Sequence, residues 1–321
     1  MPEPAGKHRA LTILEDLIAI QSVNPHYGEG ARGERDVADY IERRARRAGL
    51  RVTRQPVLPG RDNILVELRT GRAVPTLLFE SHMDTVSLGT MKDPLVPTYR
   101  GGRLYGRGAC DTKATLAGML YAMEECAAQS DPLPCDLVFC AAVDEEHAYR
   151  GVTALIASGF QADGAVVGEP TGLRIVPASK GCARFAVRTL GRAAHSSVPQ
   201  EGDNAIYRMM RVLQYLRETA EPALAKIRHP LCGSPTLSVG VIRGGMQINI
   251  VPDRCEIEVD RRIVPGESPE RVIAELEDEM RKALEPEGVV LQVETLLLDW
   301  ALDTPLDAPI VQAARRTAER L

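Results

Sequence analysis

The sequence of 321 residues lacks any apolar run that approaches the roughly 20 residues needed to cross a bilayer. It also lacks an excess of basic residues: the net charge is −5, so a nucleic-acid-binding surface is not expected. No secretory hydrophobic region is found near the N-terminus, where two acidic residues interrupt the apolar stretch at residues 14–18. We therefore expect a cytoplasmic protein that binds neither membranes nor nucleic acids.

Cysteine is sparse and follows no metal-binding pattern. Seven cysteines, an odd number, are scattered along the chain without a Cys-x-x-Cys motif. This spacing argues against a disulfide framework and against a cysteine-rich zinc knuckle, and it fits a reducing compartment. Repeats and low-complexity tracts are also absent. Gly106-Arg107-Gly108 is not followed by Gly-Lys-Ser/Thr, so a phosphate-binding P-loop is not expected.

The composition that is present, 44% hydrophobic and 26% charged, is typical of a globular protein, and the length suits two domains. In the first part of the chain, helical spacing alternates with short apolar runs. We expect helices over residues 11–20, 34–48 and 112–127 and strands over 63–68, 76–80, 136–143 and 164–167. This order predicts an α/β domain over residues 1–179.

The pattern changes at about residue 180. Strands are expected over residues 182–190, 236–242, 254–262 and 289–296, with helices over 204–217 and 268–284. The order β-α-β-β-α-β describes a ferredoxin-like split unit. We interpret residues 180–297 as an inserted second domain. Residues 298–321 are expected to return to the first domain and to form a helix.

Acidic residues and one histidine stand at or just after the ends of three predicted strands. His82 follows strand 76–80, Glu145 and Glu146 follow strand 136–143, and Glu169 follows strand 164–167. Open α/β sheets keep their ligands at the carboxyl ends of their strands. Imidazole and carboxylate groups suit Zn²⁺, and a bridged pair of such ions generates hydroxide near neutral pH. The sequence therefore predicts a zinc site at these strand ends.

Each of these motifs also has an ordinary structural interpretation. In His82-x-Asp84 one side chain can bind metal while the other supports it, or the histidine is simply bonded to backbone. Asp111, in a glycine-rich turn before a helix, can bridge two cations or cap the helix. Glu145 and Glu146 are adjacent, so one can bind metal while the other acts as general base, or the pair lies on a solvated surface.

A second histidine of interest stands in the inserted domain. His195 lies in Gly191-Arg192-Ala193-Ala194-His195-Ser196. An imidazole placed over a scissile carbonyl would stabilise the oxyanion that develops there. The alternative is a loop histidine near a turn. Both interpretations are open on local evidence.

Together, and in this order, the motifs resemble those of the M20 metallopeptidases. This is the family of acetylornithine deacetylase, succinyl-diaminopimelate desuccinylase, aminoacylase and glutamate carboxypeptidase. The resemblance covers residues 10–300. It rests on His82-x-Asp84, Gly108-x-x-Asp111-x-Lys113, Glu145-Glu146, Gly168-Glu169-Pro170-Thr171, Gly191-x-x-x-His195-Ser196, Gly244-Gly245, Asn249-Ile250-Val251-Pro252 and Asp260-Arg261-Arg262.

The resemblance implies a zinc-peptidase-like mixed-sheet catalytic domain that holds two zinc ions per subunit, with Co²⁺ as a possible substitute. His82 and Glu169 would bind one ion and Glu146 the other. Asp111 would bridge both ions through a cis peptide to Thr112.

The resemblance also implies the catalytic roles. Glu145 would deprotonate the attacking water and pass the proton to the leaving amine, and Asp84 would hold the tautomer of His82. His195 would reach the active site of a partner subunit, because the inserted domain of this family commonly forms a homodimer. Asn249 and Arg262 would bind the substrate, and Arg262 would contact the carboxylate of the substrate.

One element of the family pattern is missing from this sequence. The family takes its last metal ligand, a histidine, from a segment near the C-terminus, and here only His229, inside the inserted domain, follows His195. We expect either a fragment that lacks its C-terminal segment or a shortened protein whose second metal is poorly held. An open sheet edge would then remain.

Three hypotheses follow. The first is a two-zinc amidohydrolase that removes an acetyl or succinyl group from a small N-acyl amino acid, with a dipeptidase or carboxypeptidase of the same family as a close alternative. The second is a catalytically silent homologue that acts only as a dimer or as a metal-binding protein. The third, an unrelated α/β binding protein, would require the order of the motifs to be chance.

Overall fold

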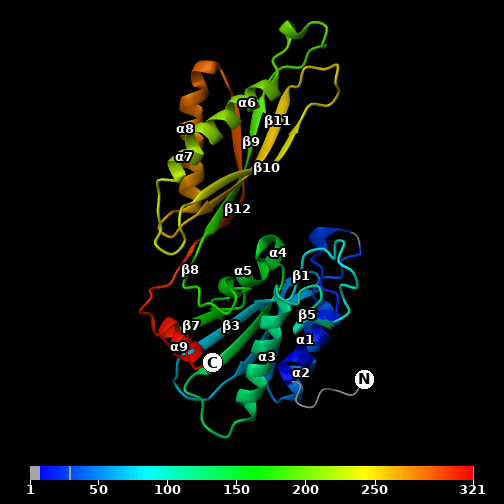
Figure 1. Cartoon of the computed structure of the whole chain (residues 1–321), viewed down its shortest axis with the longest axis vertical. Coiled ribbons are helices and arrows are strands. Elements are labelled where there is room, and N and C mark those ends of the chain that lie inside the picture. Colours follow the sequence, from blue (N-terminus) through cyan, green and yellow to red (C-terminus); the bar gives the residue numbers. More distant parts are fainter. Residues whose placement is uncertain (1–7, 29, 321) are drawn as a thin grey trace. The chain divides into compact units, whose positions relative to one another are not determined.

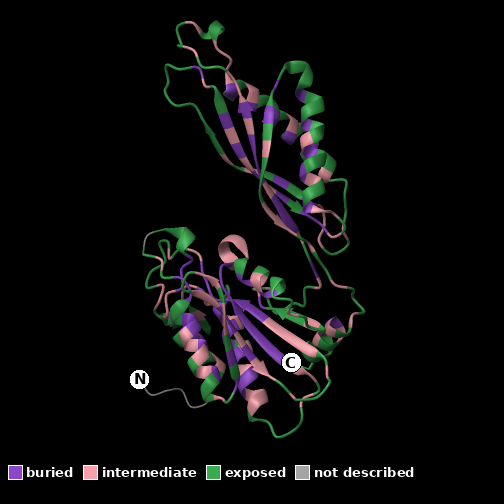
Figure 2. Ribbon diagram, turned by 180° about the vertical axis from the view of Figure 1, so that it is seen from behind, coloured by how far each residue is buried: buried purple, intermediate pink, exposed green. Residues whose placement is uncertain are grey.

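The computed structural model describes residues 8–28 and 30–320. The chain divides into two units, Met1–Arg174 and Ile175–Leu321. Figure 1 shows the elements of each unit, and Figure 2 shows that buried residues concentrate along the strands and on the inner faces of the helices. No helix among the described residues is long and apolar enough to cross a membrane.

The first unit is built on a mixed five-stranded sheet with the strand order β1-β2-β6-β3-β7. Strand β3 pairs in parallel with β6 and with β7. Strand β2 pairs antiparallel with β6 and with β1. The predicted mixed sheet is confirmed. The strands are β1 (Arg51–Leu58), β2 (Arg61–Leu68), β3 (Thr76–His82), β6 (Asp136–Ala142) and β7 (Gly164–Val167).

Strand β1 was not predicted from the sequence. Its residues Arg-Val-Thr-Arg-Gln-Pro-Val-Leu carry few apolar side chains, and only Val52 among them is buried. Pairing with β2, rather than an apolar pattern, makes this edge segment a strand.

Helices cover both faces of this sheet. On one face α1 (Arg9–Ala19), α2 (Arg35–Arg47) and α3 (Lys113–Ala128) pack on alternate strand residues such as Ile64, Phe139 and Ala141. On the other face α4 (Glu145–Ala148) and α5 (Arg150–Ala157) follow β6, and a smaller cluster forms around Cys140 and Leu155. The two faces follow from the alternation of side chains along each strand. Short segments complete the unit: η1 (Pro25–Tyr27), β4 (Thr98–Arg100) and β5 (Arg103–Tyr105).

The second unit contains an antiparallel sheet of order β10-β11-β9-β12, with two helices packed on one face. The predicted order β-α-β-β-α-β is confirmed. Its elements are β9 (Gly181–Leu190), α6 (Ala205–Tyr215), β10 (Thr236–Gly244), β11 (Arg254–Ile263), α8 (Pro269–Leu284) and β12 (Leu291–Asp299). After α6 the helix continues through η3 (Leu216–Ala220) into α7 (Glu221–Leu224), and η2 (Pro199–Glu201) and η4 (Glu285–Glu287) are single turns.

Two short strands join the ends of this split unit. β8 (Ala178–Ser179) lies before β9, β13 (Leu302–Asp303) lies after β12, and the two pair antiparallel. The chain therefore enters and leaves the unit at one place, as an inserted domain requires. Helix α9 (Pro309–Ala318) follows and is grouped with the second unit. The return of residues 298–321 to the first domain stays a prediction.

Two glycines of the first unit should respond in opposite ways to alanine. At Gly151 an added Cβ would lie 2.4 Å from the carbonyl oxygen of Val143 and 2.7 Å from Oδ1 of Asn63. We expect Gly151→Ala to lower the free energy of unfolding by about 1–3 kcal/mol, because backbone cannot yield to the new methyl group. Denaturant titration of the purified protein measures the change.

The control is Gly118→Ala, in helix α3. Nothing lies within 4 Å of a Cβ at this exposed glycine. We expect that substitution to stabilise the protein by about 0.5–1 kcal/mol, through the lower entropy of the unfolded chain. A Gly151→Ala variant as stable as the parent would contradict the packing described here.

Candidate metal centre

Three parallel strands bring the predicted ligands to one edge of the first sheet. His82 is the last residue of β3 and pairs with Ala142 of β6. Glu145 and Glu146 follow β6 in the next turn, and Glu169 follows β7 on the other side of β3. Because the carboxyl ends of parallel strands meet at the same edge, residues separated by 87 positions in the sequence become neighbours.

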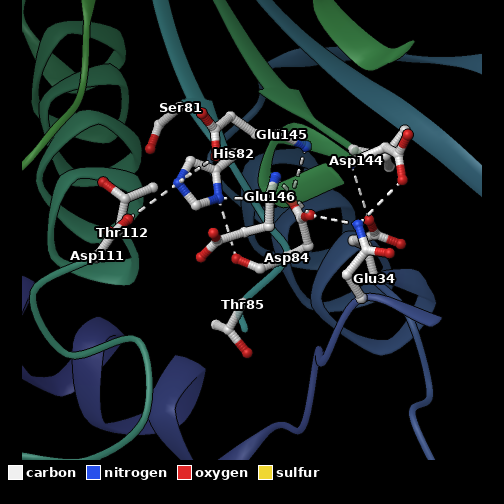
Figure 3. A network of polar contacts seen from close by, with 12 residues as sticks. Glu34, Ser81, His82, Asp84, Thr85, Asp111, Thr112, Asp144, Glu145 and Glu146 are labelled. Carbon is white, nitrogen blue, oxygen red and sulfur yellow. Dashed lines mark hydrogen bonds and ion pairs between the residues drawn. The ribbon is translucent and has the colours of Figure 1, made fainter. Parts of the chain in front are cut away.

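The imidazole of His82 is the centre of this group (Figure 3). Its Nε2 atom lies 3.2 Å from Oδ1 of Asp111, 3.7 Å from Oε2 of Glu145 and 3.8 Å from Oε1 of Glu169. Ligand atoms of His82, Asp111 and Glu146 all lie within 4.8 Å of one another. The structure thus brings together the four residues predicted as metal ligands and the predicted base.

The donor set fits zinc. Two ligand atoms that each lie about 2.0–2.1 Å from a tetrahedral ion are separated by about 3.3 Å, and the His82–Asp111 distance of 3.2 Å agrees with this. His82 is buried, whereas the side chain of Asp111 is 55% exposed. The group is therefore anchored in the sheet on one side and open on the other.

Asp111 enters the cluster from the loop before α3. The peptide bond between Asp111 and Thr112 is cis, as the resemblance implied. The N-cap of α3 is Thr112, so the interpretation of Asp111 as a simple helix cap is wrong. The buried hydroxyl of Thr112 donates to the carbonyl of Gly168 at 2.8 Å, which ties this loop to the segment that carries Glu169.

Lys113, the last residue of the Gly-x-x-Asp-x-Lys motif, fixes the same loop from behind. Its ammonium group is buried and donates to the carbonyl oxygens of Leu17 at 2.9 Å and Ile20 at 2.6 Å. Burial lowers the pKa of Lys113 to about 7. The lysine thus joins the carboxyl end of α1 to the beginning of α3.

Asp84, proposed from the resemblance to orient His82, lies against its imidazole. Nδ1 of His82 lies 3.0 Å from the carbonyl oxygen of Asp84 and 3.4 Å from its carboxylate. A proton on Nδ1 is therefore directed away from the cluster, and Nε2 faces the carboxylates. The carboxylate of Asp84 also accepts from the backbone N–H groups of Glu145 at 3.2 Å and Glu146 at 3.1 Å.

The cluster carries more negative charge than its own residues can neutralise. Burial is the main cause that raises the pKa of Glu145, to about 7. The charge of His82 lowers this pKa, and the neighbouring carboxylates raise it further. Burial also raises the pKa of Glu146 and of Glu169. Burial alone would lower the pKa of His82, but hydrogen bonds to Asp111 and Asp84 prevail and raise it to about 11. Without a metal ion, protons kept by His82 and Glu145 balance the negative charge that a bound cation would balance.

Two predicted residues of the second unit also lie together. The N–H of Ser196 donates to the carbonyl of Asn249 at 3.0 Å, so the loops of His195 and Asn249 are adjacent. Nδ1 of His195 accepts from the N–H of Ser197 at 3.2 Å and lies 2.8 Å from its hydroxyl. An imidazole whose Nδ1 accepts in this way carries a proton on Nε2, and the residue is exposed.

Arg262 lies elsewhere in the same unit. It is near the carboxyl end of β11, whereas Asn249 precedes the beginning of that strand, and eight residues of strand span about 26 Å. The guanidinium of Arg262 forms an ion pair with Asp260 at 2.8 Å. The structure does not bring Arg262 and Asn249 together, and the substrate-binding role of Arg262 stays a prediction.

Sequence reasoning missed four residues that lie directly behind the cluster: Asn24, Glu34, Arg61 and Asp144 (Figure 3 labels Glu34 and Asp144). Apart from Asp144, which precedes the Glu145-Glu146 pair, they come from remote segments with no recognisable spacing. No local signal would have identified them.

The chain is similar to known peptidases and deacylases. A family model described as a peptidase dimerisation domain matches residues 178–288. Acetylornithine deacetylase of Myxococcus xanthus is 34% identical over 309 residues, which span 93% of this chain and 79% of the relative. A probable succinyl-diaminopimelate desuccinylase of Staphylococcus aureus is 29% identical over 283 residues, spanning 79% of this chain and 67% of the relative.

Among solved structures, an M20 family metallo-carboxypeptidase of Sulfolobus solfataricus matches with a TM-score of 0.77. The match covers 98% of this chain and 83% of the other, at 19% identity. An aminopeptidase of Bacillus cereus matches with a TM-score of 0.74 at 22% identity, over 97% of this chain and 81% of the other. These two likenesses concern the fold alone.

Without metal, the protein is expected to lose stability as the pH rises from about 5 to about 8. The raised pKa values of Glu145 and His82 mean that the folded protein keeps protons that the unfolded chain releases in this range. A group whose pKa is raised on folding stabilises the folded state below its unfolded pKa and loses that contribution as the pH passes its folded pKa. Calorimetry of EDTA-treated protein across this range measures the fall in Tm.

Glu145→Gln separates this effect from the titration of the rest of the chain. The neutral amide removes one of the titrating groups, so the fall in Tm of this variant should be smaller than that of the parent. Glu125→Gln, at a surface ion pair with Arg9, is the control and should behave as the parent does. Equal falls for the parent and Glu145→Gln would show that the cluster does not govern the pH dependence.

Proposed function

Because this chain belongs to the M20 family of metallopeptidases and deacylases, we propose that it is a two-zinc enzyme that removes an N-acyl group from an amino acid. Membership of the family makes it a metal-dependent hydrolase of amide or peptide bonds. The identity and number of the ions, the substrate and the roles of single residues belong to the proposal. The observation that carries it is the convergence of His82, Asp111 and Glu146, with ligand atoms within 4.8 Å of one another.

The four ligands proposed are His82, Asp111, Glu146 and Glu169. Asp111 offers two carboxylate oxygens and is the residue suited to bridge two ions. When bound, zinc polarises a carbonyl oxygen and lowers the pKa of water, so that a nucleophile is available near neutral pH. Side chains of the protein are proposed to transfer the proton and to stabilise the oxyanion.

Glu145 is proposed as the general base. Its Oε2 atom lies 3.7 Å from Nε2 of His82, so the carboxylate faces the same space as the ligands. It takes the proton of the attacking water and later transfers it to the nitrogen of the leaving amine. Its side chain is 34% exposed, which leaves it accessible to a substrate.

His195 is proposed to stabilise the oxyanion. Because Ser197 donates to Nδ1, the imidazole presents an Nε2–H donor to solvent. A neutral donor of this kind suits the oxygen of a tetrahedral intermediate. Asn249, on the adjacent loop, is proposed to bind the same substrate. Arg262 is proposed to bind the substrate carboxylate, which requires the guanidinium to release Asp260. Because strand β11 separates Arg262 from Asn249 within one subunit, the two residues would have to come from different subunits to bind one substrate.

We propose a homodimer formed through the second unit, in which His195 serves the active site of the partner subunit. The match of residues 178–288 to a peptidase dimerisation domain supports this assembly. The unit also exposes apolar side chains around its edge strand β10, among them Ile242, Met246 and Ile248. Exposed apolar groups of this kind are typical of surfaces that are covered by a partner.

The names of the relatives support a ranking of the candidate substrates. The relative with 34% identity is named acetylornithine deacetylase, which favours an N-acetyl or N-succinyl amino acid over a peptide. A dipeptidase or carboxypeptidase is the second candidate, since solved structures of similar fold include a metallo-carboxypeptidase and an aminopeptidase. A catalytically silent dimer or metal-binding protein is the third. The cytoplasmic location stays a prediction.

Hydrolysis of a substrate panel tests the proposal. The purified chain, loaded with Zn²⁺ or Co²⁺, is assayed against N-acetyl amino acids, N-succinyl amino acids and dipeptides. We expect metal-dependent release of the amine, fastest with an N-acyl amino acid. Preference for dipeptides would establish the peptidase instead, and a folded protein with no turnover would favour the silent homologue. Metal analysis adds a second measure, with about two ions per chain expected for the enzyme.

Glu145→Ala is the matched control for this assay. The variant should keep its zinc, because the ligands are intact, and should lose turnover by about 100-fold or more, since general-base catalysis contributes about 10²–10⁴-fold. Turnover that survives this substitution would remove Glu145 as the base.

His195→Ala tests the oxyanion role. We expect kcat to fall by about 100-fold, which is the loss measured when one oxyanion donor is removed, with zinc content unchanged. His229→Ala is the control, since His229 lies in the same unit and its Nδ1 accepts from the N–H of Cys232 in a similar turn. An unchanged rate for His195→Ala would exclude it from the mechanism.

A further inference from the structure

A buried group of polar side chains lies directly behind the metal cluster, and we name it the support network. Asn24, Glu34, Asp84 and Asp144 are completely buried, and the side chain of Arg61 is 13% exposed. Figure 3 shows Glu34, Asp84 and Asp144 beside His82 and the Glu145-Glu146 turn. Nothing in the reaction proposed above uses Asn24, Glu34 or Arg61. Buried charges of this kind require an explanation, because burial without partners is costly.

Arg61 is the cation of the network. Its Nε and Nη2 atoms donate to the two carboxylate oxygens of Glu34, both at 2.6 Å. Nη2 also donates to Oδ1 of Asp144 at 2.9 Å. This forked geometry fixes both carboxylates at once, which a lysine could not do. Arg61 thus joins strand β2 to the segment before α2 and to the turn after β6.

Asn24 links the network to the residue that orients His82. Its Nδ2 group donates to Oδ2 of Asp84 at 2.7 Å and to Oδ1 of Asp144 at 3.0 Å. Its Oδ1 atom accepts from the N–H of His26 at 3.0 Å, so the amide orientation follows from a backbone donor. One side chain therefore joins the two aspartates that stand nearest to the metal ligands.

The network ends on the ligands themselves. The carboxylate of Asp84 accepts from the N–H groups of Glu145 and Glu146, and its carbonyl oxygen lies 3.0 Å from Nδ1 of His82. Asp144 adopts a left-handed backbone, with φ of 68°, and its N–H donates to Oε1 of Glu34 at 3.0 Å. Aspartate adopts this conformation more readily than most residues, and here hydrogen bonds to Glu34, Arg61 and Asn24 hold it. The direction of Glu145 and Glu146 thus depends on Glu34 and Arg61.

We infer that Asn24, Glu34 and Arg61 are positioning residues of the metal centre, an inference that rests on the proposed function. They touch neither substrate nor ion. They hold Asp84 and the Asp144 turn so that His82 and Glu146 bind metal and Glu145 faces the reacting water. Groups that orient metal ligands typically contribute 10–100-fold to affinity or activity, and the same range is expected here.

Glu34→Gln and Glu124→Gln form a matched pair of variants. Both glutamates are buried in the first unit and pair with arginines, Glu34 with Arg61 and Glu124 with Arg44 at 2.6 Å. Only Glu34 belongs to the support network. Zinc affinity is measured by competition with a chromophoric chelator, Tm is measured on metal-free protein, and kcat and KM are measured on the preferred panel substrate.

For Glu34→Gln we expect zinc affinity to fall by about 10–100-fold and kcat to fall by a similar factor, with KM changed by less than about threefold. Glu124→Gln should lower Tm while zinc affinity stays within about threefold of the parent. Equal zinc affinities in the two variants would overturn the inference, because the effect of Glu34 would then be general stability.

Asn24→Ala provides an independent test if Glu34→Gln does not fold. It removes the two donors without leaving a buried arginine unpaired, and the same loss of zinc affinity is expected. Arg61→Lys should recover part of the affinity lost in Arg61→Met. Zinc affinity unchanged in Asn24→Ala overturns the inference. Absence of hydrolysis by the parent would count against the proposed function alone, since the comparison of zinc affinities does not use turnover.

Discussion

The repulsion among carboxylates around one buried imidazole is the constraint on which the first unit depends. Asp111, Glu145, Glu146 and Glu169 converge on His82, whose Nε2 atom lies 3.2 Å from one of these carboxylates and 3.7–3.8 Å from two others. Such an arrangement is unfavourable unless a cation or protons balance it. Burial, with a further contribution from the neighbouring carboxylates, raises the pKa of Glu145, and hydrogen bonds to Asp111 and Asp84 raise that of His82 against its burial. Stability and metal binding are therefore linked at one edge of the sheet.

Buried hydrogen bonds next to the cluster stabilise this unfavourable arrangement. A single arginine pairs with two buried carboxylates, and an asparagine joins two aspartates, so the turn that carries Glu145 and Glu146 is held from the side opposite the ligands. Lys113 holds the Asp111 loop to α1 in the same manner. Energetically costly arrangements of this kind are typical of functional sites, where surrounding hydrogen bonds orient the ligands.

Much of the fold could be predicted because its elements have clear patterns. The buried strands at residues 136–142 and 181–190 and the amphipathic helix at 269–284 lie close to the predicted ranges. Strand β1 escaped prediction because an exposed edge needs no apolar alternation. The short helices α4 and α5 escaped it because left-handed residues, Asp144 and Tyr149, interrupt that segment. Such conformations depend on contacts with remote residues.

The sequence alone determined which side chains are available as ligands, and the order of His82-x-Asp84, Asp111, Glu145-Glu146 and Glu169 resembles that of a family of metal-dependent hydrolases. Only the tertiary structure decided which residues support them. Asn24, Glu34 and Arg61 come from two loops and a strand, and no periodicity joins them. Their roles exist because parallel strands and packed helices bring these segments together, and contact in space leaves no regular trace along the chain.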